Sequence, residues 1–219
     1  VIAATTTRRA QLGITEDDLR HARDAAVGAL EGGRALDRAA LLSAISEGGT
    51  VIDGQRGYHL LGHLAQTGVL VLGPISGRQQ AYVLLAEWVR DPRGPGRDEA
   101  MGELADRYFR SHGPATERDL ARWSGLPLGD VRRGLALCGD RLARLELGGV
   151  TYHLAPEVLD AVPAALTAPA VPDARLLPGF DEYVLGYGDR SAAVAPEHAQ
   201  AVVPGNNGMF LPTIVIDGE

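Results

Sequence analysis

The chain has 219 residues, 45% of them hydrophobic, and a net charge of −7, which allows one large domain or two to three small ones. No apolar run approaches the roughly 18 residues of a membrane-spanning helix, and the first residues lack a signal-peptide layout. The single cysteine, Cys138, excludes an internal disulfide and is expected in the core, so we predict a cytoplasmic protein that contacts no membrane. All 21 basic residues are arginines, which excludes lysine Schiff-base chemistry within these residues.

Three helices are predicted at the start of the chain. Thr15 with Asp18 three residues later is typical of a capping box, and Leu19, Ala22, Ala26 and Leu30 follow at helical spacing. Asp37 is expected to cap a second helix, and a third is expected to run up to Gly68.

A hairpin is predicted next, with strands at residues 69–72 and 81–85 and a loop at 73–78. Three helices followed by a hairpin is the order of a winged helix, so we assign a winged-helix domain to residues 1–90. Two prolines and two glycines within residues 91–97 indicate a linker after it.

The same order recurs in residues 97–155. An amphipathic helix is expected to stop at Gly113, Thr116 with Asp119 resembles a second capping box, and a third helix is expected at 129–137. Here Leu120 and Trp123 are expected to supply the apolar face of the second helix. Strands at 142–147 and 150–154 around Gly148-Gly149 complete a second predicted winged helix. The alternative for both units is a protein–protein module.

The last part of the chain has a different composition. A second linker is predicted at residues 164–173, and a partial β-rich domain at 173–219 with short strands and one helical turn near Pro196. The dipeptide Asp217-Gly218 is typical of a type I′ turn. We interpret the abrupt ends as those of a fragment, and the fold class as α+β.

The negative charge is unevenly distributed. Residues 1–90 and 97–155 each contain nine arginines and nine acids, whereas residues 156–219 contain two arginines and nine acids. The helical units can therefore present local basic faces, for which Arg118, Arg122, Arg132 and Arg133 are the candidates. The alternative is a solvated surface on which these arginines form ion pairs.

Several segments together resemble the winged-helix DNA-binding proteins of the AlkZ-like DNA glycosylase family. They are RLLPGFDEYVLGY at 175–187, DRS at 189–191, NNGMF at 206–210, GPAT and WSGLP within 113–127, GQRGY at 54–58, GRQQ at 77–80 and EW at 87–88. The resemblance implies a bacterial protein with tandem winged helices followed by a small β-barrel-like domain. It also implies that some relatives remove alkylated purines or unhook interstrand cross-links.

The same resemblance leaves the catalytic residues unassigned. Active members carry a glutamine–apolar–glutamine or glutamine–x–aspartate motif in a first winged helix, and no glutamine of this chain stands in that pattern. We therefore expect the first winged helix to lie upstream of Val1. No cofactor is expected.

Other groups of residues give only weak signals for a metal site or an acid–base pair. His59 and His63 have the spacing of a metal pair but lack a third ligand, so no metal is expected. Asp181 and Glu182 are expected in a strand, where adjacent side chains point to opposite faces.

We thus predict a protein that binds double-stranded DNA and is related to DNA glycosylases. Its expected DNA-binding residues are Arg118, Arg122, Arg132, Arg133, Arg56, Tyr58, His59 and Arg78. The alternatives are a non-enzymatic transcriptional regulator and a protein-interaction scaffold.

Overall fold

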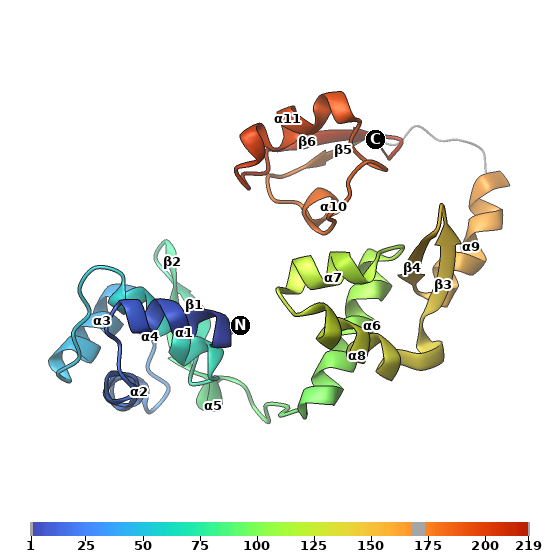
Figure 1. Ribbon diagram of the computed structural model, residues 1–219. Coiled ribbons are helices and arrows are strands. Elements are labelled where there is room, and N and C mark those ends of the chain that lie inside the picture. The colour runs from blue at the N-terminus through green and yellow to red at the C-terminus, as the bar shows by residue number, and fades with distance from the viewer. Residues whose placement is uncertain (1, 168–173, 219) are drawn as a thin grey trace. The chain divides into compact units, whose positions relative to one another are not determined.

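A computed structural model describes residues 2–167 and 174–218 of the chain (Figure 1). The chain divides into two compact units, residues 1–94 and 95–219. Both combine helices with small antiparallel sheets, each of two strands, so the α+β class is confirmed. No helix in the described residues is long and apolar enough to cross a membrane.

Unit 1 contains helices, one hairpin and a short final helix. In chain order these are α1 (Ile2–Gln11), α2 (Glu16–Leu30), α3 (Arg38–Glu47), α4 (Arg56–Gln66), β1 (Leu70–Ser76), β2 (Gln79–Leu84) and α5 (Leu85–Trp88). The predicted capping box is confirmed, because the Asp18 amide donates to Thr15 Oγ1 (3.1 Å) and the Thr15 amide donates to Asp18 Oδ2 (2.8 Å). Asp37 caps α3 by accepting from the Ala40 amide.

The core of unit 1 forms where one side of α2 packs against α3, α4 and the hairpin. Its fully buried apolar residues include Ala22, Ala26, Leu30, Leu41, Ile45, Leu60 and Leu64. The helical spacing of the first three shows that the apolar periodicity selects the buried face of α2.

The predicted loop at residues 73–78 was wrong in extent. The first strand continues into the predicted loop as far as Ser76, and the second begins at Gln79, so the turn itself is short. The register is irregular between Leu72 and Ile75. Pro74 has no amide hydrogen and interrupts the ladder there. The second predicted strand ends one residue earlier than expected, at Leu84, because Leu85 begins α5. The Leu85 amide donates to the Val69 carbonyl.

Unit 2 begins with a helical part and ends with a part made of short elements. The helical part has α6 (Arg97–His112), α7 (Glu117–Ser124), α8 (Leu128–Cys138), η1 (Gly139–Arg141), β3 (Ala143–Leu147), β4 (Val150–Leu154) and α9 (Pro156–Thr167). The later part has β5 (Ala174–Leu177), α10 (Glu182–Leu185), η2 (Pro196–His198), α11 (Ala199–Val202), η3 (Pro204–Asn206) and β6 (Thr213–Ile216).

Helices α6 and α8 pack closely in the core of unit 2. A Cβ atom added to Gly134 on α8 would lie 2.6 Å from the Met101 carbonyl oxygen on α6, so only glycine fits at this crossing. Tyr108 and Phe109 are the largest fully buried side chains beside it. Cys138 is buried as expected, and burial raises the pKa of its thiol.

The two units share a feature that the sequence did not reveal. Leu36, directly before the N-cap of α3, forms an isolated antiparallel bridge with Tyr82 on β2. Ala115, directly before the N-cap of α7, forms the same bridge with His153 on β4. In each unit one residue directly before a helix cap therefore pairs with the second strand of the hairpin.

The expected barrel is absent from residues 174–218. Strands β5 and β6 form one antiparallel pair, with Leu176 opposite Ile214, and the chain between them folds mainly into short helical turns and loops. A barrel requires a closed ring of strands, which two four-residue strands cannot form. The turn at Asp217-Gly218 has the predicted positive φ angles, 53° and 93°.

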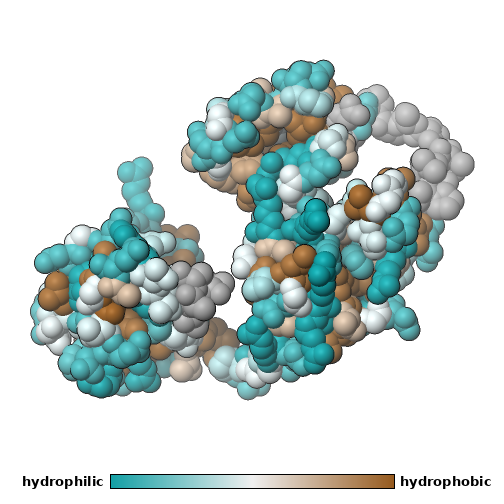
Figure 2. Space-filling view, viewed as in Figure 1, coloured by the Kyte–Doolittle hydropathy of each residue, from teal (hydrophilic) through white to brown (hydrophobic). Residues whose placement is uncertain are grey.

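One face of this small sheet remains exposed. Leu176, Ile214 and Ile216 are 81%, 65% and 58% exposed, and hydrophobic atoms are visible over this region in Figure 2. Of the predicted linker at 164–173, residues 164–167 belong to α9, which corrects that boundary, and 168–173 lie outside the described residues.

Candidate nucleic-acid interface

The two arginines of α8 are exposed but paired with acids. Arg132 donates through Nε and Nη2 to both carboxylate oxygens of Glu117 (2.8 and 2.6 Å), and Arg133 donates to Asp98 (3.3 and 2.6 Å). The hydrogen bond from Arg132 lowers the pKa of Glu117, so both partners remain charged near neutral pH. The ion-paired surface considered as an alternative is therefore present on α8.

The two arginines of α7 lie in a different setting. Arg118 and Arg122 are one helical turn apart, are exposed, and have no carboxylate partner within the described part of the chain. Both line a concavity of about 980 Å³, here called the α7 hollow. The α7 hollow is also lined by Asp119, Tyr152, Tyr183, Tyr187, Asp189 and Arg190.

Arg190 brings a third guanidinium to the α7 hollow from the later part of unit 2. Its Nε donates to the Val184 carbonyl (2.8 Å), and its Cζ lies 4.9 Å from the ring centre of Phe210. Burial, together with the nearby charge of Arg122, lowers the pKa of Arg190. An arginine stays protonated despite such a shift, so the hollow keeps this positive charge.

The acids in the hollow are occupied by groups of the protein itself. Asp119 Oδ2 accepts from the Thr116 amide (2.8 Å) and hydroxyl (2.7 Å), which completes the predicted capping box of α7. Asp119 Oδ1 accepts from the Gly188 amide (2.7 Å), and Asp189 accepts from the Ser191 amide (2.9 Å). These carboxylates are thus engaged by backbone donors, whereas the arginines are not engaged by carboxylates.

Side chains of α6 and α7 bind the segment around α10 and so shape the hollow. Trp123 Nε1 donates to Glu182 (3.0 Å), Tyr108 donates its hydroxyl to the Gly186 carbonyl (2.8 Å), and Tyr187 donates to the His112 carbonyl (2.8 Å). Burial raises the pKa values of both tyrosine hydroxyls, which keeps them as neutral donors.

Two expectations are corrected by these contacts. Trp123 is 42% exposed and joins α7 to α10, because its indole N–H finds a charged acceptor there; it does not simply extend the apolar face with Leu120. Asp181 and Glu182 do not lie in a strand: Asp181 caps α10 through the Tyr183 amide, a local bond that favours helix initiation.

The expected DNA-binding residues of unit 1 differ in how accessible they are. Arg56 donates to the carbonyls of Val51 (2.9 Å) and Leu12 (2.7 Å) and pairs with Asp18 (3.2 Å), so its donors are used within the unit. Tyr58 is 62% exposed and contacts His59 edge to face. Arg78 is exposed at the turn of the β1–β2 hairpin.

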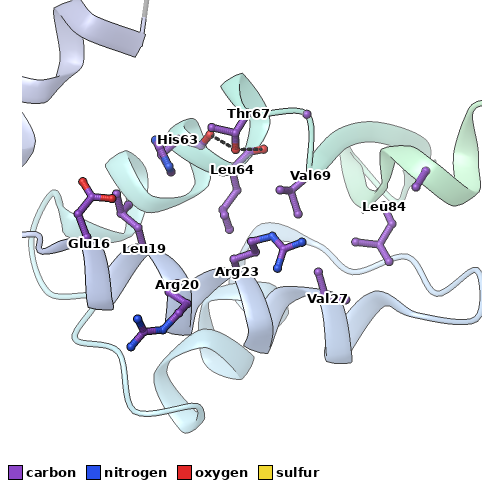
Figure 3. Close-up of a pocket in the computed structure, with 12 residues that line it drawn as sticks. Glu16, Leu19, Arg20, Arg23, Val27, His63, Leu64, Thr67, Val69 and Leu84 are labelled. Atoms are coloured by element: carbon purple, nitrogen blue, oxygen red, sulfur yellow. Dashed lines mark hydrogen bonds between the residues drawn. The ribbon is translucent and has the colours of Figure 1, made fainter. Parts of the chain in front are cut away.

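Unit 1 also has a hollow, of about 640 Å³, between α2 and the end of α4 (Figure 3). Its arginines are Arg20 and Arg23 on α2, which pair with Asp17 (3.0 Å) and Asp24 (3.4 Å). Burial, then the charge of Arg9, lowers the pKa of His63, so this side chain is neutral at pH 7. The hollow in unit 1 therefore offers less unpaired positive charge than the α7 hollow.

No cluster of three or more metal-ligating side chains occurs among the residues that the structure describes. His59 and His63, the only spacing suggestive of a metal pair, are not joined by further ligands there. Sequence reasoning missed Arg190 as part of a cationic site, because its partner Arg122 is 68 positions away and only the folded chain brings them together.

The fold and the arginine-lined hollow define a class: an α+β protein with two helix-and-hairpin units and a surface suited to anions. The family model described as "DNA glycosylase AlkZ-like" matches residues 1–219, and the chain belongs to this family.

A curated protein and a solved structure, both from Streptomyces sahachiroi, support the assignment. An interstrand DNA cross-link repair glycosylase is 34% identical over 162 residues, which is 71% of this chain and 43% of the relative. The solved structure of the DNA glycosylase AlkZ matches with a TM-score of 0.77 at 28% identity, covering 98% of this chain and 59% of that chain. The chain thus spans about half the length of these relatives.

Proposed function

We propose that this chain is the DNA-binding part of a DNA glycosylase that acts on alkylated or cross-linked double-stranded DNA. The α7 hollow is the observation that carries the proposal. It gathers Arg118, Arg122 and Arg190 while the acids beside them are held by backbone donors. Guanidinium groups that are free of carboxylates are the usual ligands of DNA phosphates. The relative named as an interstrand cross-link repair glycosylase supports the choice of substrate.

The DNA-binding architecture in this proposal is a tandem of winged helices, in residues 1–90 and 97–155, followed by the β-rich residues 173–219. The repeated order of helices and hairpin supports it, and so do the two equivalent bridges at Leu36 and Ala115. In a winged helix, a short strand before the second helix pairs with the hairpin. The exposed Tyr58 and Arg78 and the half-buried His59 of unit 1 are proposed as further DNA contacts.

The reaction we propose for the whole enzyme is hydrolysis of the N-glycosidic bond. Alkylation makes a purine positively charged and therefore a better leaving group, so the enzyme needs to position water and stabilise a cationic sugar. The chain contains no lysine, which leaves no side-chain amine for a lyase step in these residues. We assign no catalytic residue within residues 1–219.

A salt titration of DNA binding tests the proposed function. If about four arginines contact phosphates, the logarithm of the binding constant should fall with the logarithm of salt concentration with a slope of about −3 to −4. The measurement is fluorescence anisotropy on an undamaged duplex. Tight binding with a slope near zero, or no binding at low salt, would contradict the proposal.

An activity assay tests whether residues 1–219 bind DNA without catalysing base release. The 219-residue chain, incubated with a duplex that contains N7-methylguanine, should release the base no faster than the spontaneous reaction, because the family's glutamine motif is not in this sequence. Abasic sites are counted without heating, by labelling the exposed sugar aldehyde at neutral pH, because heat alone releases N7-methylguanine. Release well above the uncatalysed control would place catalytic residues within residues 1–219.

A further inference from the structure

Arg122 and Arg190 are held as close neighbours by the turn at residues 186–191. The Gly188 amide is bonded to Asp119 (2.7 Å), and a Cβ atom at Gly188 would lie 3.2 Å from Asp119 Oδ1 and 3.7 Å from Arg122 Cδ. This turn therefore lies directly on α7, beside Arg122. Two residues further on, Arg190 is fixed by its bond to the Val184 carbonyl. These contacts keep Arg190 beside α7, near the exposed side chain of Arg122.

The guanidinium of Arg190 has few partners for its donors. Nε bonds to a carbonyl, Nη2 is buried and has no hydrogen-bond partner, and one face lies over the ring of Phe210. No carboxylate among the described residues forms an ion pair with Arg190 or Arg122. Unsatisfied buried donors and neighbouring like charges both cost free energy. An anion bound in the hollow would relieve the repulsion between the two guanidinium groups.

We propose that Arg122 and Arg190 bind one phosphodiester group of DNA in the α7 hollow. Helix α7 and the later part of unit 2 then contact the same DNA strand. This inference rests on the proposed function. It assigns DNA contact to Arg190, which lies outside both helix-and-hairpin units, and places the strongest phosphate contact on α7. Helix α8 is less suited to that contact because its two arginines already hold acids.

The chemistry of the α7 hollow fits a phosphodiester with its flanking sugars. Two guanidinium forks can each donate to the non-bridging oxygens of one phosphate. The volume of about 980 Å³ exceeds the need of a small inorganic anion, and Tyr152 and Tyr183 also line the hollow. Sugar carbons adjoining the phosphate can pack against such rings.

The test compares two charge-removing variants in the full 219-residue chain. Arg122→Gln removes a proposed ligand, and Arg107→Gln removes an equal charge from α6, outside the lining of the hollow. Arg122→Gln should weaken duplex binding roughly three- to tenfold and reduce the salt slope by about one unit, as expected for the loss of one phosphate contact. Arg107→Gln should change the slope by much less.

A second experiment, with inorganic phosphate and no DNA, tests this site independently of the proposed function. Inorganic phosphate should raise the melting temperature of the native chain above its value in chloride at equal ionic strength, because a ligand that binds the folded state stabilises it. Arg122→Gln should abolish this increase, whereas Arg107→Gln should retain it. Arg190→Lys, which keeps the charge but loses the fork, should reduce it without unfolding unit 2.

Each result has a distinct meaning. No specific stabilisation by phosphate, or equal effects of the two glutamine variants, would overturn the site. A phosphate effect lost in Arg122→Gln, with DNA binding no weaker than in Arg107→Gln, would show a site for free phosphate and overturn the DNA assignment while the proposed function stands. Absence of duplex binding by the native chain, with the phosphate effect intact, would instead overturn the proposed function and leave the anion site.

Discussion

At the scale of single residues, Asp119 connects local helix initiation with the packing of unit 2. It is 8% exposed, caps α7 through Thr116 and accepts the Gly188 amide from a segment 69 residues away. The equivalent Asp18 in unit 1 makes the same cap but pairs with Arg56 in place of a distant amide. A cap that is common in any helix thus also positions the turn that carries Arg190.

Asp119→Ala should destabilise unit 2 by roughly 2–4 kcal/mol, the sum of a lost cap and an unsatisfied amide at Gly188. Urea unfolding in a Trp88→Phe background, followed by the fluorescence of Trp123, measures the change. Asp119→Asn keeps an acceptor oxygen and should be less damaging. If Ala and Asn were equally mild, the bond to Gly188 would contribute little to the docking of the later segment.

Ion pairing on α8 gives a second prediction for single residues. Glu117 occupies the guanidinium of Arg132, so Glu117→Gln should free that arginine, tighten duplex binding and steepen the salt slope by about one unit. The matched control is Glu103→Gln, which frees Arg107 on α6. Equal effects of the two variants in a binding titration would mean that net charge matters and that Arg132 does not reach the phosphates.

At the scale of elements, α6 and α8 cross at close range in unit 2. Gly134 lies against the Met101 carbonyl, a backbone atom that cannot rotate away, so any side chain forces the helices apart. Gly129, on the same helix, has no atom within 4 Å of an added Cβ. The two glycines of α8 therefore serve different purposes.

Gly134→Ala should lower the stability of unit 2 by about 1–3 kcal/mol through overpacking. Gly129→Ala, the matched control, should be neutral or stabilise by up to about 1 kcal/mol, because alanine has the higher helix propensity. Thermal unfolding monitored by circular dichroism compares them. A stabilising Gly134→Ala would show that α6 and α8 are farther apart than the structure places them.

At the scale of the whole molecule, the chain between the two units is exposed and irregular. Each unit has its own buried apolar cluster. The boundary falls at Gly94, within the proline- and glycine-rich residues 91–97. Exposed segments of this composition are the usual sites of proteolytic cleavage.

A protease specific for arginine should first cut after Arg90 or Arg93 and leave two resistant fragments, near residues 1–93 and 94–219. Mass spectrometry of a short digestion identifies them. Arg107, within α6, and Arg20, within α2, provide internal controls, because helical backbone should be cleaved more slowly. An early cut within α6 would contradict the prediction that residues 91–97 are the most accessible segment.

Much of the fold could be predicted because its signals are local. Thr15 with Asp18 and Thr116 with Asp119 start helices through bonds between residues three apart, and Gly125 ends α7 in a left-handed conformation. The spacing of Ala22, Ala26 and Leu30 marks a buried face without knowledge of what covers it. Short-range hydrogen bonds and apolar periodicity depend on neighbouring residues alone, so the sequence by itself determined these elements and the family to which the chain belongs.

The candidate site was decided by the tertiary structure. Whether an exposed arginine is paired depends on residues far along the chain: Arg133 meets Asp98 35 positions earlier, and Arg190 reaches α7 because Gly188 binds Asp119. The absence of a closed barrel in residues 174–218 also follows from long-range strand pairing. Composition and spacing do not specify such contacts, since charge partners and sheet neighbours are chosen by the packing of the core; only the folded chain distinguishes the paired arginines of α8 from the unpaired arginines of the α7 hollow.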